Sequence, residues 1–210
     1  MSDTEVDIPR VRAARQAREF GFPKRQTEEI EWRRVKLTPD QREAQQQLAS
    51  IARAGGLAYL YGRNGVGKTL IVSGLGIGWE KVRHENRDAT GVAGMNAARY
   101  WRAAELCGDL IRWQQSEATD KGSSPDDLAR RAGLLVLDEI GDLKWTDFQS
   151  TTLSNIIDDR YTEKRATILI GNQKPNQLAK IGCPLSILDR TRDGGAIIDA
   201  SGWKNMRGVA

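Results

Sequence analysis

A glycine-rich segment between an apolar run and a helical pattern constrains this chain more than any other feature. The segment, residues 62–69, reads "GRNGVGKT" and has the spacing G-x-x-x-x-G-K-T. Residues 57–61 before it are apolar enough for a short buried strand, and residues 68 to about 82 have the pattern of a helix. This order predicts a phosphate-binding loop, because backbone N–H groups and a helix N-terminus then point at one anion.

Each residue type in this loop has a physical role. Glycines lack a Cβ, so the backbone can approach phosphate oxygens closely. Lys68 would bring an ammonium group to the β- and γ-phosphates, and the Thr69 hydroxyl would bind Mg²⁺. We therefore expect ATP and Mg²⁺ as ligands. The expected nucleotide-binding residues are Gly62, Arg63, Asn64, Gly65, Val66, Gly67, Lys68, Thr69 and Leu70.

An apolar run that ends in two acids follows further along the chain. The run "LLVLDEIGD" reads as a buried strand, and Asp138 and Glu139 come at its end. Asp138 would hold Mg²⁺ through water, and Glu139 would act as general base toward the attacking water. This motif predicts hydrolysis of the bound triphosphate.

Three further polar side chains complete the predicted site. Asn172 ends the strand "ATILIGN", where its amide could orient the attacking water, although Asn is equally common there as a turn former. Arg190 and Arg192 lie on a later helical segment. Either arginine could reach the γ-phosphate of a neighbouring subunit, or it could form a surface salt bridge.

Strands alternate with helices along the chain, which predicts an α/β fold with a parallel sheet covered on both faces. Thr38 with Gln41, and Thr146 with Gln149, have the spacing of capping boxes that begin two helices. Residues 84–96 are polar and read as a loop. We divide the chain into a basic helical extension, residues 1–36, and an ATPase domain, residues 37–210.

The extension carries nine Lys or Arg and four Glu between residues 10 and 36. This excess fits docking on a partner protein or on DNA, although a solvated helix face is the commonest cause of such a run. Because the capping box at Thr38 begins the next helix independently, we expect a chain that starts near Val35 to fold and to bind ATP.

Composition excludes several other classes of protein. Hydrophobic residues make up 39% and charged residues 29%, and no apolar run approaches the roughly 20 residues that span a bilayer. The first ten residues, "MSDTEVDIPR", lack the apolar region of a secretory signal, so we expect a cytoplasmic protein. The single histidine and two distant cysteines do not have the spacing of a zinc site.

Several linked motifs together resemble the AAA+ domain of the DnaC helicase loaders and of the related IstB transposition helper ATPases. They are GxxxxGKT, "LLVLDEIG", "GNQ", "ILDR" and a closing W-x-x-x-R, and the resemblance covers roughly residues 37–207. It implies a three-layer AAA+ P-loop fold without a helical lid. The roles implied are Walker A for Lys68 and Thr69, Walker B for Asp138 and Glu139, sensor 1 for Asn172, a trans-acting arginine finger for Arg190, and a sensor-2-like contact for Arg207.

The resemblance implies an ATP-dependent loader of a DnaB-type replicative helicase that binds single-stranded DNA and assembles into a homo-oligomer on ATP and DNA. The alternative within the family is a transposition helper that acts on duplex DNA. A small-molecule kinase would need an acceptor pocket and an arginine-bearing lid, neither of which is evident. A non-hydrolysing adaptor would not need Glu139. Candidate DNA contacts, which could equally be packing residues, are Arg99, Trp101, Arg102, Arg112 and Trp113.

Overall fold

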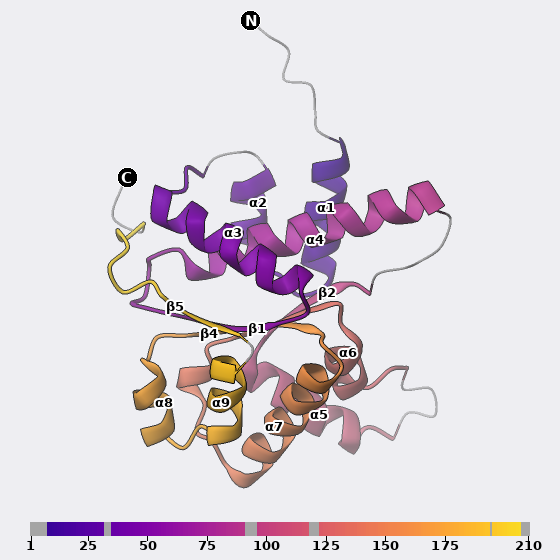
Figure 1. Ribbon diagram of the computed structural model, residues 1–210. Coiled ribbons are helices and arrows are strands. Elements are labelled where there is room, and N and C mark those ends of the chain that lie inside the picture. The colour runs from indigo at the N-terminus through magenta and orange to yellow at the C-terminus, as the bar shows by residue number, and fades with distance from the viewer. Residues whose placement is uncertain (1–7, 32–34, 91–95, 118–121, 194, 207–210) are drawn as a thin grey trace, which may run out of the picture.

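Five parallel strands form a single sheet in the centre of the molecule (Figure 1). The computed structural model describes residues 8–31, 35–90, 96–117, 122–193 and 195–206. The strand order is β2-β3-β4-β1-β5. Because all neighbouring strands run parallel, their carboxyl ends meet at the same edge. The strands are β1 (Leu57–Tyr61), β2 (Ala98–Arg102), β3 (Leu134–Asp138), β4 (Ala166–Gly171) and β5 (Ala196–Asp199).

Helices cover both faces of this sheet. One face carries α1 (Ile8–Glu19), α2 (Lys24–Glu31), α3 (Pro39–Arg53) and α4 (Lys68–Thr90) (Figure 1). The other carries α5 (Ala103–Gln115), α6 (Pro125–Arg131), α7 (Asp147–Thr162), α8 (Pro175–Lys180) and α9 (Leu185–Asp193). A short 3₁₀ helix, Ile140–Asp142, follows β3, and no helix occurs in residues 200–206 after β5. The predicted three-layer α/β P-loop architecture is confirmed.

The central strands β1, β3 and β4 are buried along their whole length. Alternate residues face the two helical layers, so Leu60 and Ile168 pack toward α3 and α4 while Tyr59 and Leu169 pack toward α7 and α9. Strands buried on both faces need continuous apolar sequence, which is why "LAYLY" and "LLVLD" do not alternate with polar residues.

Helix α4 is longer than its sequence predicts. It continues to Thr90, so the loop predicted for residues 84–96 is wrong for residues 84–90. These residues are polar, but they contain no glycine or proline, and Lys81 lies 3.8 Å from Glu85 one helical turn away. Residues 91–95 lie outside the described ranges. Both predicted capping boxes are present, at Thr38 and at Thr146.

The first two helices are part of the core. Ala13, Ala14 and Ala17 of α1 are completely buried, and Phe22 is 2% exposed. The Phe22 ring packs against Gly76 of α4, where a Cβ would stand 2.4 Å from two ring carbons. The boundary proposed at residue 36 therefore does not separate two cores. The periodicity of α1 identifies an apolar face, but not that α4 covers it.

A buried arginine joins three elements of the other layer. Arg160 of α7 is completely buried, and its guanidinium donates to the carbonyl oxygens of Ala129 at 2.9 Å and Ala132 at 2.7 Å. Its Nε donates to the hydroxyl of Thr167 on β4 at 2.9 Å. These bonds satisfy the charged group inside the protein and connect α6, α7 and β4.

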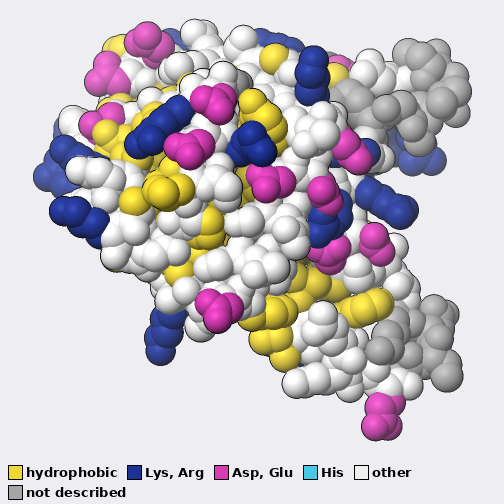
Figure 2. Space-filling view, turned by 60° about the horizontal axis from the view of Figure 1, so that its bottom comes forward, with side chains coloured by type: hydrophobic (Ala, Val, Ile, Leu, Met, Phe, Trp, Pro, Cys, Tyr) yellow, Lys and Arg dark blue, Asp and Glu magenta, His cyan; other side chains and the backbone are white. Residues whose placement is uncertain are grey.

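Charged and apolar side chains share the surface of the α5–α9 layer (Figure 2). Its exposed large apolar side chains are Ile111, Phe148, Ile181 and Leu185. None of the helices in the described ranges has both the length and the apolar character that a bilayer crossing requires.

If residues 13–22 belong to the core, Phe22→Ala should lower the free energy of unfolding by about 3–5 kcal/mol, because the ring leaves a cavity against α4. Phe148→Ala is the matched control, since Phe148 is 38% exposed. It should cost less than about 1 kcal/mol. Urea denaturation followed by circular dichroism measures both values. Equal losses for the two variants would contradict this account of the N-terminal helices.

Candidate active site

The loop between β1 and α4 turns through two glycines with left-handed backbone angles. Gly65 has φ +83° and Gly67 has φ +94°, a region that other residues rarely adopt. The C-terminal segment holds this loop from outside: the Met206 N–H donates to the Gly65 carbonyl at 2.8 Å. A Cβ on Gly67 would stand 2.5 Å from the Met206 sulfur. The turn and the close approach both require glycine here.

Lys68 lies at the start of α4 and is 7% exposed. Its Nζ donates to the carbonyl oxygens of Gly62 at 2.7 Å and Arg63 at 3.0 Å. It also donates to Oδ1 of Asn172, just after β4, at 3.0 Å. The fold therefore brings the predicted phosphate-binding lysine and the predicted sensor asparagine into direct contact.

The Asp138 carboxylate at the end of β3 is hydrogen-bonded on both oxygens. Its Oδ2 accepts from the Thr69 hydroxyl at 2.9 Å and from the Tyr100 hydroxyl at 2.7 Å. Its Oδ1 accepts from the Glu139 N–H at 2.7 Å. The structure thus joins the two residues predicted to hold Mg²⁺. It adds Tyr100 of β2, which no local sequence pattern identifies.

Glu139 has a left-handed backbone conformation, with φ 59° and ψ 33°. A non-glycine residue in this region is uncommon and often marks a functional site. The side chain is 46% exposed, and one oxygen lies 3.3 Å from Nε of Arg102. Burial raises the pKa of Glu139, and the positive charge of Arg102 opposes that change. The carboxylate lines the same cleft as Lys68, where it could accept a proton from water.

A cleft of ≈ 790 Å³ lies at this end of the sheet, and its volume is within the size range of small-molecule sites. Its lining includes Lys68, Thr69, Asp138, Glu139 and Asn172. The cleft extends from the phosphate-binding loop to α2 and to residues 204–206. The loop end fits a triphosphate, because backbone N–H groups and Lys68 converge there. The far end offers polar side chains to a nucleoside, and these are Arg25, Gln26, Glu29, Lys36, Lys204 and Asn205.

The donor set also fits a magnesium ion. In the described part of the chain, no three His, Cys, Asp or Glu side chains are grouped as a protein-only metal site. Mg²⁺ does not need such a group, because it takes one or two protein oxygens and completes its shell with phosphates and water. The Thr69 hydroxyl and the adjacent Asp138 carboxylate provide these oxygens.

Gln41 of α3 connects the capping box to the phosphate-binding loop. Its side chain is completely buried. Its Oε1 accepts from the Thr38 N–H at 2.9 Å, and its Nε2 donates to the Val66 carbonyl at 3.0 Å. The sequence pattern predicts the first of these bonds. The second depends on how α3 packs against the loop, so local sequence does not reveal it.

The other predicted binding residues of the loop have different environments. Arg63 and Asn64 are exposed at its tip. The Val66 side chain is 1% exposed and packs in the core, so only its backbone is available to a ligand. Leu70 is 7% exposed at the side of the cleft. Arg207 lies outside the described residues.

The two candidate finger arginines lie on α9 and do not line the cleft of their own chain. Arg190 Nε lies 3.2 Å from Asp158 of α7, and its guanidinium stacks 4.8 Å from the Tyr161 ring centroid. Arg192 lies 3.4 Å from Asp189. No local sequence pattern identifies Asp158 as a partner of Arg190, because that contact depends on the packing of α7 against α9.

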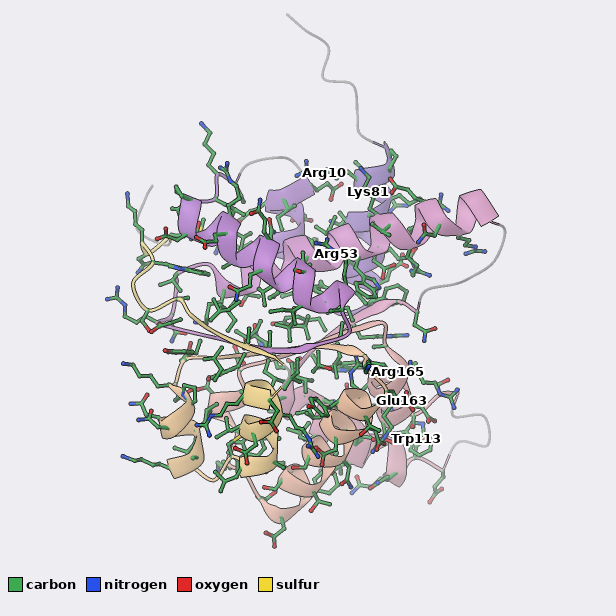
Figure 3. All side chains as sticks on the ribbon, viewed as in Figure 1. Arg10, Arg53, Lys81, Trp113, Glu163 and Arg165 are labelled. Atoms are coloured by element: carbon green, nitrogen blue, oxygen red, sulfur yellow. The ribbon has the colours of Figure 1, made fainter. Side chains whose placement is uncertain are left out.

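Several of the candidate DNA contacts have partners within the chain. Arg99 stacks 4.8 Å from the Phe20 ring centroid, and Trp101 Nε1 donates to Asp109 at 3.2 Å. Figure 3 places Trp113 in the α5–α9 layer, on the opposite side of the view from the phosphate-binding loop. Arg112 pairs with the same Asp109 carboxylate, so the fold brings Trp101 and Arg112 together at the contact between β2 and α5. Their role in DNA binding stays a prediction.

Comparison with known proteins agrees with this geometry. A family profile described as "IstB-like ATP binding protein" matches residues 5–181. Among curated protein sequences, none matches this chain. AMPPCP-bound DnaA from Aquifex aeolicus has a similar structure, with TM-score 0.60 and 16% identity over 82% of this chain and 50% of that chain. The chain therefore spans about half the length of that DnaA.

Two shorter solved structures are similar over most of their length. The DnaC helicase loader has TM-score 0.57 and 17% identity over 79% of this chain and 92% of that chain. DnaI has TM-score 0.56 and 22% identity over 82% of this chain and 88% of that chain. At these identities the likeness establishes the fold.

The Gln41 contact predicts a selective effect on nucleotide binding. Gln41→Glu keeps an acceptor for the Thr38 N–H but removes the donor to the Val66 carbonyl. We expect about tenfold weaker binding of a fluorescent ADP analogue. Gln149→Glu is the matched control, since Gln149 makes the same capping box in α7 but is only partly buried. Equal nucleotide affinities in the two variants would rule out a role for Gln41 in holding the loop.

Proposed function

Because this chain belongs to the IstB-like ATP-binding family and is an AAA+ ATPase, we propose that it loads a DnaB-type replicative helicase onto single-stranded DNA. In this proposal the ATP-bound protein binds the helicase, and ATP hydrolysis releases the helicase. The observation that carries the proposal is the meeting of Lys68, Asn172, Thr69 and Asp138 at one edge of the sheet, beside Glu139. The likeness to the DnaC helicase loader, over 92% of that chain, supports the AAA+ fold that the proposal requires.

The residues divide the chemistry among them. Lys68 and the loop N–H groups would bind the phosphates, and Thr69 and Asp138 would hold Mg²⁺, which would neutralise charge on the phosphates. Asn172 orients the attacking water, and Glu139 accepts its proton on a carboxylate oxygen. Arg102 lies 3.3 Å from Glu139 and stabilises its ionised form.

The proposal includes assembly of several copies on ATP and DNA. Arg190 is remote from the cleft of its own chain, so its proposed role as a finger requires the cleft of a neighbour. The same helix carries Leu185, which is 64% exposed. An exposed leucine and an arginine on one helix provide the apolar and cationic groups of a subunit contact.

Docking on the helicase is proposed for the outer face of the N-terminal helices. The inner face of α1 packs in the core, while Arg12 and Arg15 are exposed on its other side. These cations fit an acidic protein surface. The proposed partner contact is therefore part of the folded ATPase unit. Removal of residues 1–36 would damage the core as well as the contact, contrary to the expectation, drawn from the capping box at Thr38, that a chain starting near Val35 folds.

The second candidate is a transposition helper that acts on duplex DNA and delivers a transposase. The observation that favours it is the description of the matching family profile, which names IstB-like proteins. The ATPase chemistry is the same in both proposals, and the partner differs.

A variant arrested before hydrolysis tests the partner. Glu139→Gln should bind ATP but turn it over at least about 100-fold more slowly, because proton acceptance is needed only in the transition state. Lys68→Ala is the control that should lose nucleotide affinity. With ATP, tagged Glu139→Gln protein should retain a hexameric helicase from native lysate, identified by mass spectrometry. Recovery of a transposase instead would favour the second candidate, and unchanged turnover would remove Glu139 from its role.

Complementation between variants tests the finger. Arg190→Ala and Lys68→Ala proteins should each be inactive, but a mixture should regain ATPase activity at interfaces that pair an intact Lys68 with an intact Arg190. A finger supplied in trans contributes about 10³ to 10⁵ in rate, so even a minority of such interfaces should be measurable. The control is a mixture of Arg192→Ala protein with Lys68→Ala protein. No recovery despite demonstrated co-assembly would assign the role elsewhere.

A further inference from the structure

The Asp138 carboxylate receives a hydrogen bond that the ATPase motifs do not require. The Tyr100 hydroxyl donates to Oδ2 at 2.7 Å, and the Thr69 hydroxyl donates to the same oxygen at 2.9 Å. We propose that Tyr100 is a positioning residue for the metal-binding pair, which fixes the carboxylate of Asp138 and through it the hydroxyl of Thr69. This inference rests on the Mg²⁺-dependent chemistry proposed above.

The sheet register explains how the phenol reaches the carboxylate. Tyr100 of β2 pairs with Val136 of β3, so Asp138 lies two residues beyond its direct partner. Residues two apart on a strand share one face, so Asp138 lies diagonally across this parallel pair from Tyr100, and the phenol reaches it. That face is the one covered by α4, whose first turn carries Thr69. Side chains from β2 and α4 thus both donate to one oxygen atom of Asp138 on β3.

The surroundings make this contact hard to replace. Asp138 is 5% exposed and Tyr100 is 7% exposed. The Tyr100 hydroxyl is the donor of this bond and the Asp138 carboxylate is its acceptor. Because bulk water has little access to either group, loss of the phenol leaves a lone pair of the carboxylate without a donor.

The turn between α1 and α2 holds the tyrosine from its other side. The Phe22 ring centroid lies 5.5 Å from that of Tyr100, and the Tyr100 N–H donates to the Phe20 carbonyl at 3.0 Å. The backbone and the ring are both fixed. The phenol therefore presents its proton to Asp138 from a rigid position, as preorganised metal sites require of the groups around the ligands.

When the Asp138 carboxylate is fixed, the Thr69 hydroxyl keeps donating its hydrogen bond to it. The hydroxyl then turns its lone pairs away from Asp138 and toward the phosphate end of the cleft, where the metal would bind. Without Tyr100, the carboxylate keeps the Thr69 and Glu139 bonds but loses its third restraint. The expected defect is in metal affinity, whereas phosphate binding by Lys68 and the loop should persist.

The test is Tyr100→Phe, which removes one oxygen and keeps the ring against Phe22. A fluorescent ADP analogue is titrated with the full-length protein, first in EDTA and then at fixed nucleotide with increasing Mg²⁺. We expect nucleotide affinity in EDTA to stay within about twofold, and the Mg²⁺ concentration for half-maximal response to rise about tenfold. The matched control is Tyr59→Phe, in which a completely buried tyrosine loses its partly buried 2.6 Å hydrogen bond to the Gln173 carbonyl. Its Mg²⁺ curve should not move.

Two results would overturn the proposal. One is an unchanged Mg²⁺ curve in Tyr100→Phe. The other is an equal loss of nucleotide affinity with and without Mg²⁺, which would indicate a general structural role. A double-mutant cycle keeps the test informative if Tyr100→Phe proves unstable: in an Asp138→Asn background, the further change Tyr100→Phe should leave Mg²⁺ dependence unaltered. If wild-type protein shows no Mg²⁺ dependence at all, the proposed ATPase chemistry fails instead.

Discussion

Parallel hydrogen bonding between buried strands is the constraint on which the site depends. Lys68 and Asn172 are 104 residues apart, yet their side chains are in contact because β1 and β4 are adjacent and parallel. The register pairs Tyr61 with Gly171, so the residues that follow each strand emerge together. A slip of one residue would turn every apolar side chain of a strand to the opposite face, which the two buried cores do not permit. The packing of the core therefore also fixes the geometry of the chemistry.

The predictable parts of this protein are those encoded by local spacing. The phosphate-binding loop, the acids after β3 and both capping boxes are identified from short segments, and the structure places them as the pattern indicates. Contacts between separate elements are not encoded in this way. Gln41 with Val66, Tyr100 with Asp138, and Arg190 with Asp158 join residues 25, 38 and 32 positions apart. Polar residues 84–90 also show that composition alone does not end a helix.

The N-terminal helices have a different place in the molecule from the one that their charge suggests. The basic residues of this flank predict partner binding, but its alanines and Phe22 complete the core over α4. The Phe20 carbonyl accepts from the Tyr100 N–H, so the flank also covers the outer edge of β2, an edge strand of the sheet. Arg25 and Glu29 line the same cleft as Lys68. One short segment thus contributes to stability, to protection of the sheet edge and to the ligand site.

The attachment of the N-terminal segment to the core also depends on Gly76, a residue of α4 that lies much further along the chain. The position in α4 carries only hydrogen, and this allows the Phe22 ring to lie against the helix backbone. A methyl group there would force the Phe22 ring away from α4, because it would stand 2.4 Å from two ring carbons. Sequences that keep every nucleotide-binding residue could still differ in whether the N-terminal helices are anchored, according to the presence of one carbon atom at this position. Divergence among such ATPases can therefore begin in the spacing between two helices, with the catalytic groups unchanged.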